Sequence, residues 1–243
     1  NKAPNSRLWA TVKANAYGHG IRHVYEALRA ADGFAVLDLD EAALLRELGW
    51  RGPILLIEGV FDARDLELCS RLNLWHVVHT QEQIDMLAAH KTHTPQRVFL
   101  KLNSGMNRLG FEPAAFRGAY ARLAALPQVD EITLMTHFSD ADGPRLGRDG
   151  IDHQLAVFAA ATQDLAGEKT LANSAAILRY AEQSGLQVAQ DWVRAGIALY
   201  GSAPDYPQHA SADWGLRPAM SLRSQLISVR DIAAALVVGD TGA

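Results

Sequence analysis

Short apolar segments alternate with longer amphipathic segments along most of the chain. The apolar segments are rich in Leu and β-branched residues and are short enough for the buried strands of a parallel sheet. They predict strands at 8–12, 34–37, 54–57, 75–78, 98–102, 132–135, 170–172 and 192–194. The pattern is weakest for the last of these strands.

Between the predicted strands, apolar residues recur at helical spacing. Residues 40–48 are typical, because they begin with acidic side chains and end before Gly49, a common helix stop. The same pattern predicts helices at 62–72, 81–90, 113–126 and 152–166. About eight strand–helix units occupy residues 1–201, and this alternation predicts parallel strands joined by helical crossovers. We therefore expect an α/β fold with a (β/α)8 barrel of the TIM type, although an open doubly wound sheet would show the same alternation.

The composition changes after Gly201. Residues 202–207 are rich in Pro and are typical of a connection, whereas 220–232 place apolar residues among polar ones and predict a strand. Residues 202–243 are too few to bury an independent core. We therefore predict a barrel domain at 1–201, followed by a linker and the first strand of a β-rich C-terminal domain that continues beyond this chain.

Composition and charge narrow the possible partners. The 243 residues contain 23 basic and 27 acidic side chains, for a net charge of −4, and 49% are hydrophobic. No basic run marks a surface for nucleic acid or for an anionic membrane. No apolar run approaches the ~18 residues of a membrane span. The single cysteine, Cys69, excludes a disulfide framework or thiolate metal cage within the chain, and we expect a cytoplasmic protein.

Chemistry in a parallel barrel is expected where the strands end, because the loops that follow the strands converge on one mouth. Lys13 ends the first predicted strand and precedes the turn Gly18-His19-Gly20. A partly desolvated amine at that position would have a lowered pKa and could form a Schiff base. A lysine that extends to solvent would show the same pattern.

Three further candidates lie on the fifth and sixth strands or directly after them. Lys101 falls inside a buried strand and must therefore be paired, neutral or chemically modified. Arg108 follows this strand, where its guanidinium could bind an anionic oxygen, although a surface arginine is the alternative. His137 ends the sixth strand and could contact a ligand or be structural.

The loops after the seventh and eighth strands are where barrels most often bind phosphate. Asn173 and Ser174 lie at the first of these positions, and Arg194, Gly196 and Ile197 lie at the second. No carboxylate pair, Ser/His/Asp set or metal-binding His pair accompanies them, and we expect no metal site. A lysine, basic side chains and a phosphate cradle together suit pyridoxal phosphate. An arginine at the ring nitrogen of that cofactor, such as Arg194, would keep the nitrogen unprotonated.

Residues 12–20, Val-Lys-Ala-Asn-Ala-Tyr-Gly-His-Gly, resemble the cofactor-lysine signature of the alanine racemases without interruption. The resemblance continues in the family's order through 101–110, 136–138, 172–175, 193–201 and 217–222. It implies an isomerase that interconverts L-alanine and D-alanine with pyridoxal 5′-phosphate. The D-alanine would supply peptidoglycan or be degraded.

The resemblance implies that Lys13 both carries the cofactor and moves the α-proton on the D side. The phosphate would be bound by Tyr17, Ser174, Gly196 and Ile197, with Asn173 beside Ser174. The second base would be a tyrosine from the C-terminal domain of a partner subunit, so we expect a homodimer whose active site is completed by the partner.

The resemblance also assigns the remaining basic residues. Arg108 would bond the phenolic oxygen of the cofactor, His137 would pack at the ring, and Arg194 would bond the pyridine nitrogen. With Lys13, Arg108 and His137 are the candidates for catalysis. Lys101 stands where the family has a carbamylated lysine that orients the arginine, and a carbamate would pair its anion with Arg108.

Two departures from the family keep alternatives open. The tyrosines of the C-terminal domain are absent, because residues 239–242 read Gly-Asp-Thr-Gly near the place of a Gly-Tyr-Gly motif. The family also begins farther before its cofactor lysine than this chain does. We expect a longer enzyme, with two alternatives: a single-barrel pyridoxal phosphate-binding protein for cofactor homeostasis without racemase turnover, and an inactive barrel that serves as an interaction partner.

Overall fold

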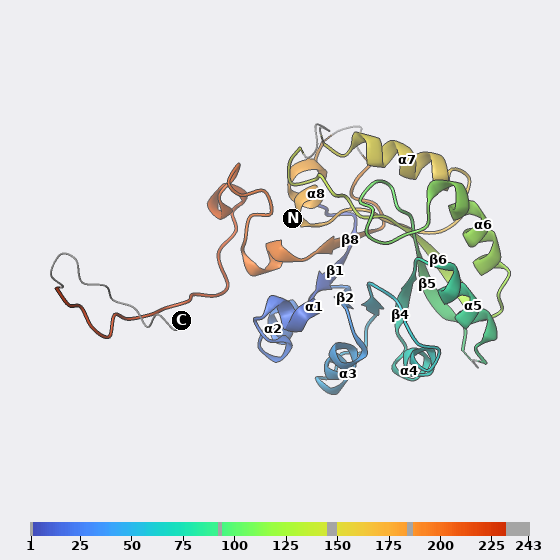
Figure 1. Cartoon of the computed structure of the whole chain (residues 1–243), viewed down its shortest axis with the longest axis horizontal. Coiled ribbons are helices and arrows are strands. Elements are labelled where there is room, and N and C mark those ends of the chain that lie inside the picture. The colour runs from blue at the N-terminus through green and yellow to red at the C-terminus, as the bar shows by residue number, and fades with distance from the viewer. Residues whose placement is uncertain (1, 92–93, 145–149, 184–186, 232–243) are drawn as a thin grey trace, which may run out of the picture.

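Eight parallel strands close into a barrel in chain order, with helices around it (Figure 1). The computed structural model describes residues 2–91, 94–144, 150–183 and 187–231. The strands are β1 (Arg7–Thr11), β2 (Gly33–Val36), β3 (Ile54–Leu56), β4 (Trp75–Val78), β5 (Gln96–Lys101), β6 (Val129–Met135), β7 (Lys169–Thr170) and β8 (Trp192–Ala195). The α-helices are α1 (Lys13–Tyr17), α2 (Ile21–Leu28), α3 (Leu39–Glu47), α4 (Asp65–Leu72), α5 (Gln81–Ala89), α6 (Pro113–Ala124), α7 (Asp152–Thr162) and α8 (Ser174–Tyr180). Two 3₁₀ helices follow, η1 (Ile197–Tyr200) and η2 (Ser211–Trp214).

The pairing of the first strand confirms the predicted barrel over an open sheet. Strand β1 lies between β2 and β8, with Trp9 opposite Gly33 on one side and Arg194 on the other. All eight predicted strands are present, but β7 rather than β8 is the shortest, at two residues. The connections between successive strands return the chain to the same end and make the strands parallel, and the pairing of β8 with β1 closes the sheet.

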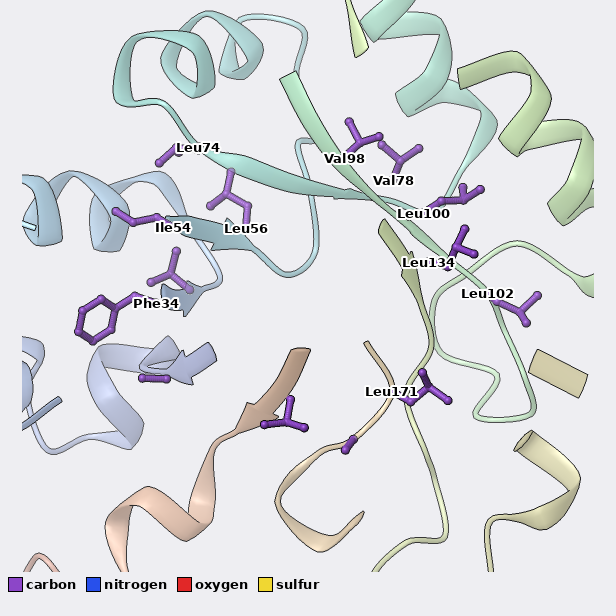
Figure 2. Close-up of a cluster of buried hydrophobic side chains, with 14 of the residues drawn as sticks. Phe34, Ile54, Leu56, Leu74, Val78, Val98, Leu100, Leu102, Leu134 and Leu171 are labelled. Atoms are coloured by element: carbon purple, nitrogen blue, oxygen red, sulfur yellow. The ribbon is translucent and has the colours of Figure 1, made fainter. Parts of the chain in front are cut away.

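Successive strand residues enter two separate apolar layers, as the period of two requires. Side chains such as Phe34, Ile54 and Leu56 pack outward under the helices, in the cluster shown in Figure 2. Their neighbours Ala35 and Leu55 point into the barrel. The outer layer attaches the helices, and the inner layer fills the barrel.

Aromatic rings fill the barrel toward the N-terminal ends of the strands. Trp9 is fully buried and stacks on Trp192 with ring centroids 4.3 Å apart. Trp75 and Phe99 meet the same indole edge-on, at 5.5 and 5.9 Å. Gly33 is required beside these rings, because a Cβ there would overlap the indole of Trp9. The packed rings leave the opposite, C-terminal end of the barrel for a site.

The predicted linker after Gly201 folds against the barrel. The carboxylate of Asp205 is buried, accepts a hydrogen bond from Trp214 Nε1 at 2.8 Å and lies 2.7 Å from His209 Nδ1. It also lies 3.8 Å from Arg179 Nε on α8. This carboxylate therefore fixes the path of the chain as it leaves the barrel.

The strand predicted at 220–232 is wrong for residues 220–231, which form no strand and run away from the barrel in Figure 1. The apolar side chains Leu222, Leu226 and Val229 are exposed. A strand needs a partner for its backbone hydrogen bonds, and the described residues offer none. Ile232 and residues 239–242 lie outside the described residues. The division into domains at 201 and 202 stays a prediction.

Within the described ranges, no helix combines the length and apolarity that crossing a bilayer requires.

We predict that Trp9→Ala lowers the free energy of unfolding by about 3–5 kcal/mol, because it empties the centre of the aromatic cluster. Equilibrium urea unfolding followed by fluorescence and circular dichroism measures the change. Phe61→Ala is the matched control, since Phe61 is exposed and its loss is expected to change stability by less than about 0.5 kcal/mol. Equal losses in the two variants would contradict this account of the barrel interior.

Candidate active site

One pocket at the C-terminal ends of the strands is lined by every residue that the sequence singles out. These residues are Lys13, Tyr17, Lys101, Arg108, His137, Asn173, Ser174, Arg194, Gly196 and Ile197. The pocket wall also includes Glu58, Asp142 and Pro204, which sequence reasoning missed. The closed parallel sheet therefore brings together residues from both halves of the barrel.

Lys13 begins a left-handed turn directly after β1. Ala14, Asn15, Ala16 and Tyr17 all have φ between 50° and 56°, a region that costs a non-glycine residue roughly 1–2 kcal/mol. Within the turn, Ala16 N donates to Val12 O at 2.7 Å, and Gly18 N donates to Ala14 O at 3.0 Å. The turn directs the chain away from β1 within one residue of Lys13.

The ammonium form of Lys13 is disfavoured in the pocket. Burial is the largest cause that lowers the pKa of Lys13, and the positive charge of Arg108 is the second. The carboxylates of Glu58 and Glu41 act in the opposite direction. The expectation of a partly desolvated amine at this strand end agrees with this environment.

Lys101 lies on β5 and is 4% exposed. Burial, followed by the charges of Arg194 and Arg108, lowers the pKa of Lys101 to about 8. The buried position therefore disfavours the ammonium form of Lys101, and whether this side chain is paired, neutral or chemically modified stays a prediction.

Arg194 on β8 is buried, and carbonyl and hydroxyl oxygens surround its guanidinium. It donates to Thr170 Oγ1 at 2.6 Å, Thr136 O at 2.7 Å and Leu171 O at 3.0 Å. Burial lowers the pKa of Arg194 to about 9, so the side chain stays charged at neutral pH. Oxygens at the ends of β6 and β7 thus hold the Arg194 guanidinium in place at the wall of the pocket.

His137 is held as a neutral imidazole. Burial and then the nearby charge of Arg194 lower the pKa of His137 well below its ordinary value. Asn173 Nδ2 lies 3.4 Å from His137 Nε2, and Asn173 Oδ1 caps α8 by accepting from Ala176 N at 3.0 Å. His137 therefore presents a neutral ring to the pocket.

A small polar recess lies where α8 and η1 begin. Ser174 Oγ accepts hydrogen bonds from Gly196 N at 2.9 Å and from Ala198 N at 3.3 Å. A Cβ on Gly196 would overlap the hydroxyl of Tyr17, so only glycine leaves this space open. Backbone N–H groups, a serine hydroxyl and a tyrosine hydroxyl are donors suited to a phosphate group. The recess therefore fits the phosphate end of pyridoxal phosphate.

Gln154 on α7 joins two site loops and was missed by sequence reasoning. It is 3% exposed, and its Nε2 donates to Ser104 Oγ at 3.1 Å and to His137 O at 3.2 Å. Its Oε1 accepts from Ser139 N at 2.9 Å. A lone glutamine among the apolar residues of a helix was the available signal, because a polar side chain on a buried face must have partners.

No group of three or more His, Cys, Asp or Glu side chains that could hold a metal ion occurs among the residues that the structure describes.

Two curated relatives resemble almost the whole chain. The alanine racemase of Polaromonas sp. (strain JS666 / ATCC BAA-500) is 65% identical over 237 residues, which cover 98% of this chain and 64% of that protein. The alanine racemase of Acidovorax sp. (strain JS42) is 66% identical over 98% of this chain and 63% of its own length. The chain thus spans less than two thirds of the length of these relatives.

Solved structures give the same likeness. A crystal structure of a biosynthetic alanine racemase from Pseudomonas aeruginosa matches with a TM-score of 0.86 and 45% identity, over 96% of this chain and 63% of that chain. The histidine racemase of Leuconostoc mesenteroides subsp. sake NBRC 102480 matches with a TM-score of 0.71 and 30% identity, over 82% of this chain and 54% of that chain.

The family comparison covers the barrel from end to end. The sequence profile described as "Alanine racemase, N-terminal domain" matches residues 1–204, the segment that forms the closed sheet and its pocket. Because this match covers most of the chain, the chain belongs to the family of the alanine racemase N-terminal domain.

Proposed function

We propose that this chain forms the cofactor-binding barrel of a pyridoxal phosphate-dependent racemase that interconverts L-alanine and D-alanine. The observation that carries the proposal is the partly desolvated Lys13 in one pocket with Lys101, Arg108 and Arg194 and with the polar groups of Tyr17 and Ser174. The curated relatives, named alanine racemases, support this activity over a cofactor-homeostasis protein. The open site points to turnover rather than to an inactive interaction partner.

The residues of the pocket fit the cofactor group by group. Lys13 would hold the cofactor covalently through its amine, while Arg108 would bond its phenolic oxygen and Arg194 its ring nitrogen. The phosphate would lie in the recess formed by Tyr17, Ser174, Gly196 and Ile197, with Asn173 beside it and His137 against the ring. When bound, pyridoxal phosphate supplies an electron sink that stabilises negative charge at the α-carbon of an amino acid.

Arg194 limits the strength of that sink. Its guanidinium remains a donor at neutral pH, and its other hydrogen bonds hold it in place at the strand ends. A donor that does not give up its proton leaves the ring nitrogen unprotonated. The pocket thereby favours return of the α-proton over deeper breakdown of the substrate.

The lowered pKa of Lys13 suits proton transfer, because a neutral amine can accept the α-proton on one face of the substrate. Inversion needs a second base on the opposite face, since a single base tends to return the proton to its original side. We assign that role to a tyrosine of a partner subunit in a homodimer. The protein would act in the cytoplasm and supply D-alanine for peptidoglycan or remove it.

Lys101 is suited to carbamate formation. Its neutral amine would add to CO₂, forming an N–C bond and releasing one proton, and the product is an anion among cations. The new carboxylate would offset the positive charge of Arg108 and orient its guanidinium toward the ligand.

We predict that Lys13→Ala lowers racemisation roughly 10³-fold or more in the full-length protein, because the variant loses both the attachment point and one base. Borohydride reduction followed by peptide mass spectrometry should place the pyridoxyl group on Lys13 in the unsubstituted protein. Lys2→Ala is the control, since Lys2 lies outside the pocket and pairs with Glu182 on the surface. Attachment at another lysine would refute the proposed site.

We predict that Arg108→Leu raises the pKa of Lys13, because the Arg108 charge is one cause of its lowering. Acetylation needs the neutral amine, so the rate at Lys13 in the cofactor-free protein at fixed pH should fall. Mass spectrometry of the acetylated peptide across a pH series measures the shift. Arg117→Leu on α6, outside the pocket, should leave the profile unchanged, and an unchanged profile in Arg108→Leu would contradict the prediction.

We predict that ¹³CO₂ labels Lys101. A carbamate carbonyl signal should appear in the ¹³C spectrum of the unsubstituted protein and disappear in Lys101→Met, which preserves much of the buried volume. Lys91→Met is the control, because Lys91 is exposed. A spectrum without the signal at saturating bicarbonate would show that Lys101 acts as an unmodified amine.

A further inference from the structure

The left-handed turn after Lys13 depends on an acceptor from another helix. Asn15 N donates to Glu41 Oε1 at 2.7 Å, although Glu41 lies on α3, beyond the second strand. The first N–H groups of any helical turn lack acceptors within that turn. The Glu41 carboxylate therefore provides the hydrogen-bond acceptor that the turn itself does not provide for Asn15 N.

The second oxygen of the same carboxylate binds the neighbouring loop. Leu37 N donates to Glu41 Oε2 at 3.0 Å, where the chain leaves β2. Glu41 N in turn donates to Asp38 Oδ1 at 2.8 Å in the N-cap of α3, which fixes the position of the glutamate backbone. One carboxylate thus ties the turn after β1 to the connection after β2.

The backbone of the turn is strained, so its conformation depends on the hydrogen bonds to Glu41. Four consecutive non-glycine residues, beginning at Ala14, hold positive φ, and such conformations persist only when the surroundings determine them. Asn15 supports the turn at its far end, where its Oδ1 accepts from Ile21 N at 2.9 Å. Loss of the Glu41 bonds would remove the acceptor of Asn15 N, and the end nearest to Lys13 would keep the bond from Ala16 N to Val12 O.

We propose that Glu41 is a positioning residue that holds the left-handed turn and thereby aims the Lys13 amine into the pocket. This inference rests on the proposed function and deepens it, because it names the group that sets the geometry of the cofactor lysine. Glu41 touches neither the cofactor nor the substrate in this account. It holds the turn through the backbone of Asn15, and its charge separately raises the pKa of Lys13.

The test compares Glu41→Ala and Glu41→Gln in the full-length protein. The glutamine keeps the size of the side chain but has one acceptor oxygen, so it can satisfy only one of the two N–H groups. Glu47→Gln is the matched control, because Glu47 lies on the same helix and pairs with Arg22 on the surface, at 3.4 Å.

The first measurement is hydrogen exchange of the peptide 13–20 in the cofactor-free protein, compared with peptides from the rest of the barrel. We expect about tenfold faster exchange of 13–20 in Glu41→Ala, a smaller increase in Glu41→Gln and no change in Glu47→Gln. The glutamine variant keeps the test valid if the alanine variant does not fold.

The second measurement is racemisation of L-alanine by the holoenzyme. We expect kcat to fall roughly 10–100-fold in Glu41→Ala while KM changes less, because the lysine is displaced but the substrate contacts remain. Glu41→Gln should lie between Glu41→Ala and the unsubstituted enzyme. Borohydride trapping at Lys13 should slow in the same order.

Three results would overturn the inference. The first is unchanged exchange of 13–20 in both variants, and the second is an equal rise in exchange throughout the barrel, which would mark a general structural role. The third is a kcat of Glu41→Ala within twofold of the unsubstituted value. If the unsubstituted protein does not racemise alanine, the proposed function fails, and the exchange of 13–20 still decides whether Glu41 holds the turn.

Discussion

Positive charge confined to one partly desolvated pocket is the constraint on which the arrangement of this barrel depends. Lys13, Lys101, Arg108 and Arg194 all line the pocket, and burial together with mutual repulsion lowers the pKa of both lysines. Cations held this close require compensation from anions or oriented acceptors. The site therefore attracts an anionic ligand, and a phosphate-bearing cofactor would supply the missing negative charge.

The closed sheet supplies the permanent part of that compensation. Arg194 points into the barrel from β8 and is surrounded by oxygens at the ends of β6 and β7, including Thr136 O and Leu171 O. Such acceptors converge only because parallel strands end together at one face. The aromatic cluster around Trp9 fills the opposite end of the barrel, so the cations lie at the C-terminal ends of the strands, where the pocket opens.

Strand positions and pocket residues could be predicted from the sequence, because both follow from local pattern and from the convergence of strand ends. The left-handed turn could not, because of its four residues only Asn15 is of a type that readily adopts positive φ, whereas Ala14, Ala16 and Tyr17 are not. The strand at 220–232 was predicted from alternation that carries no information about a pairing partner. Gln154 and Glu41 were missed because each has a partner that is distant in sequence, His137 O for Gln154 and Asn15 N for Glu41.

Two unfavourable features occur together at Lys13: the strained backbone of the turn that follows it and the partial burial of its amine. The positive φ of each non-glycine residue in the turn costs free energy, and desolvation of the Lys13 ammonium adds a further cost. The isolated segment would therefore not adopt the left-handed conformation. The packing of the barrel core offsets both costs, and the Glu41 carboxylate ties the turn to this barrel by accepting hydrogen bonds from Asn15 N and Leu37 N. A ligand that binds only this arrangement adds its own binding free energy to the stability of the fold. A cofactor attached to Lys13 would therefore stabilise the same turn and amine that the barrel core supports.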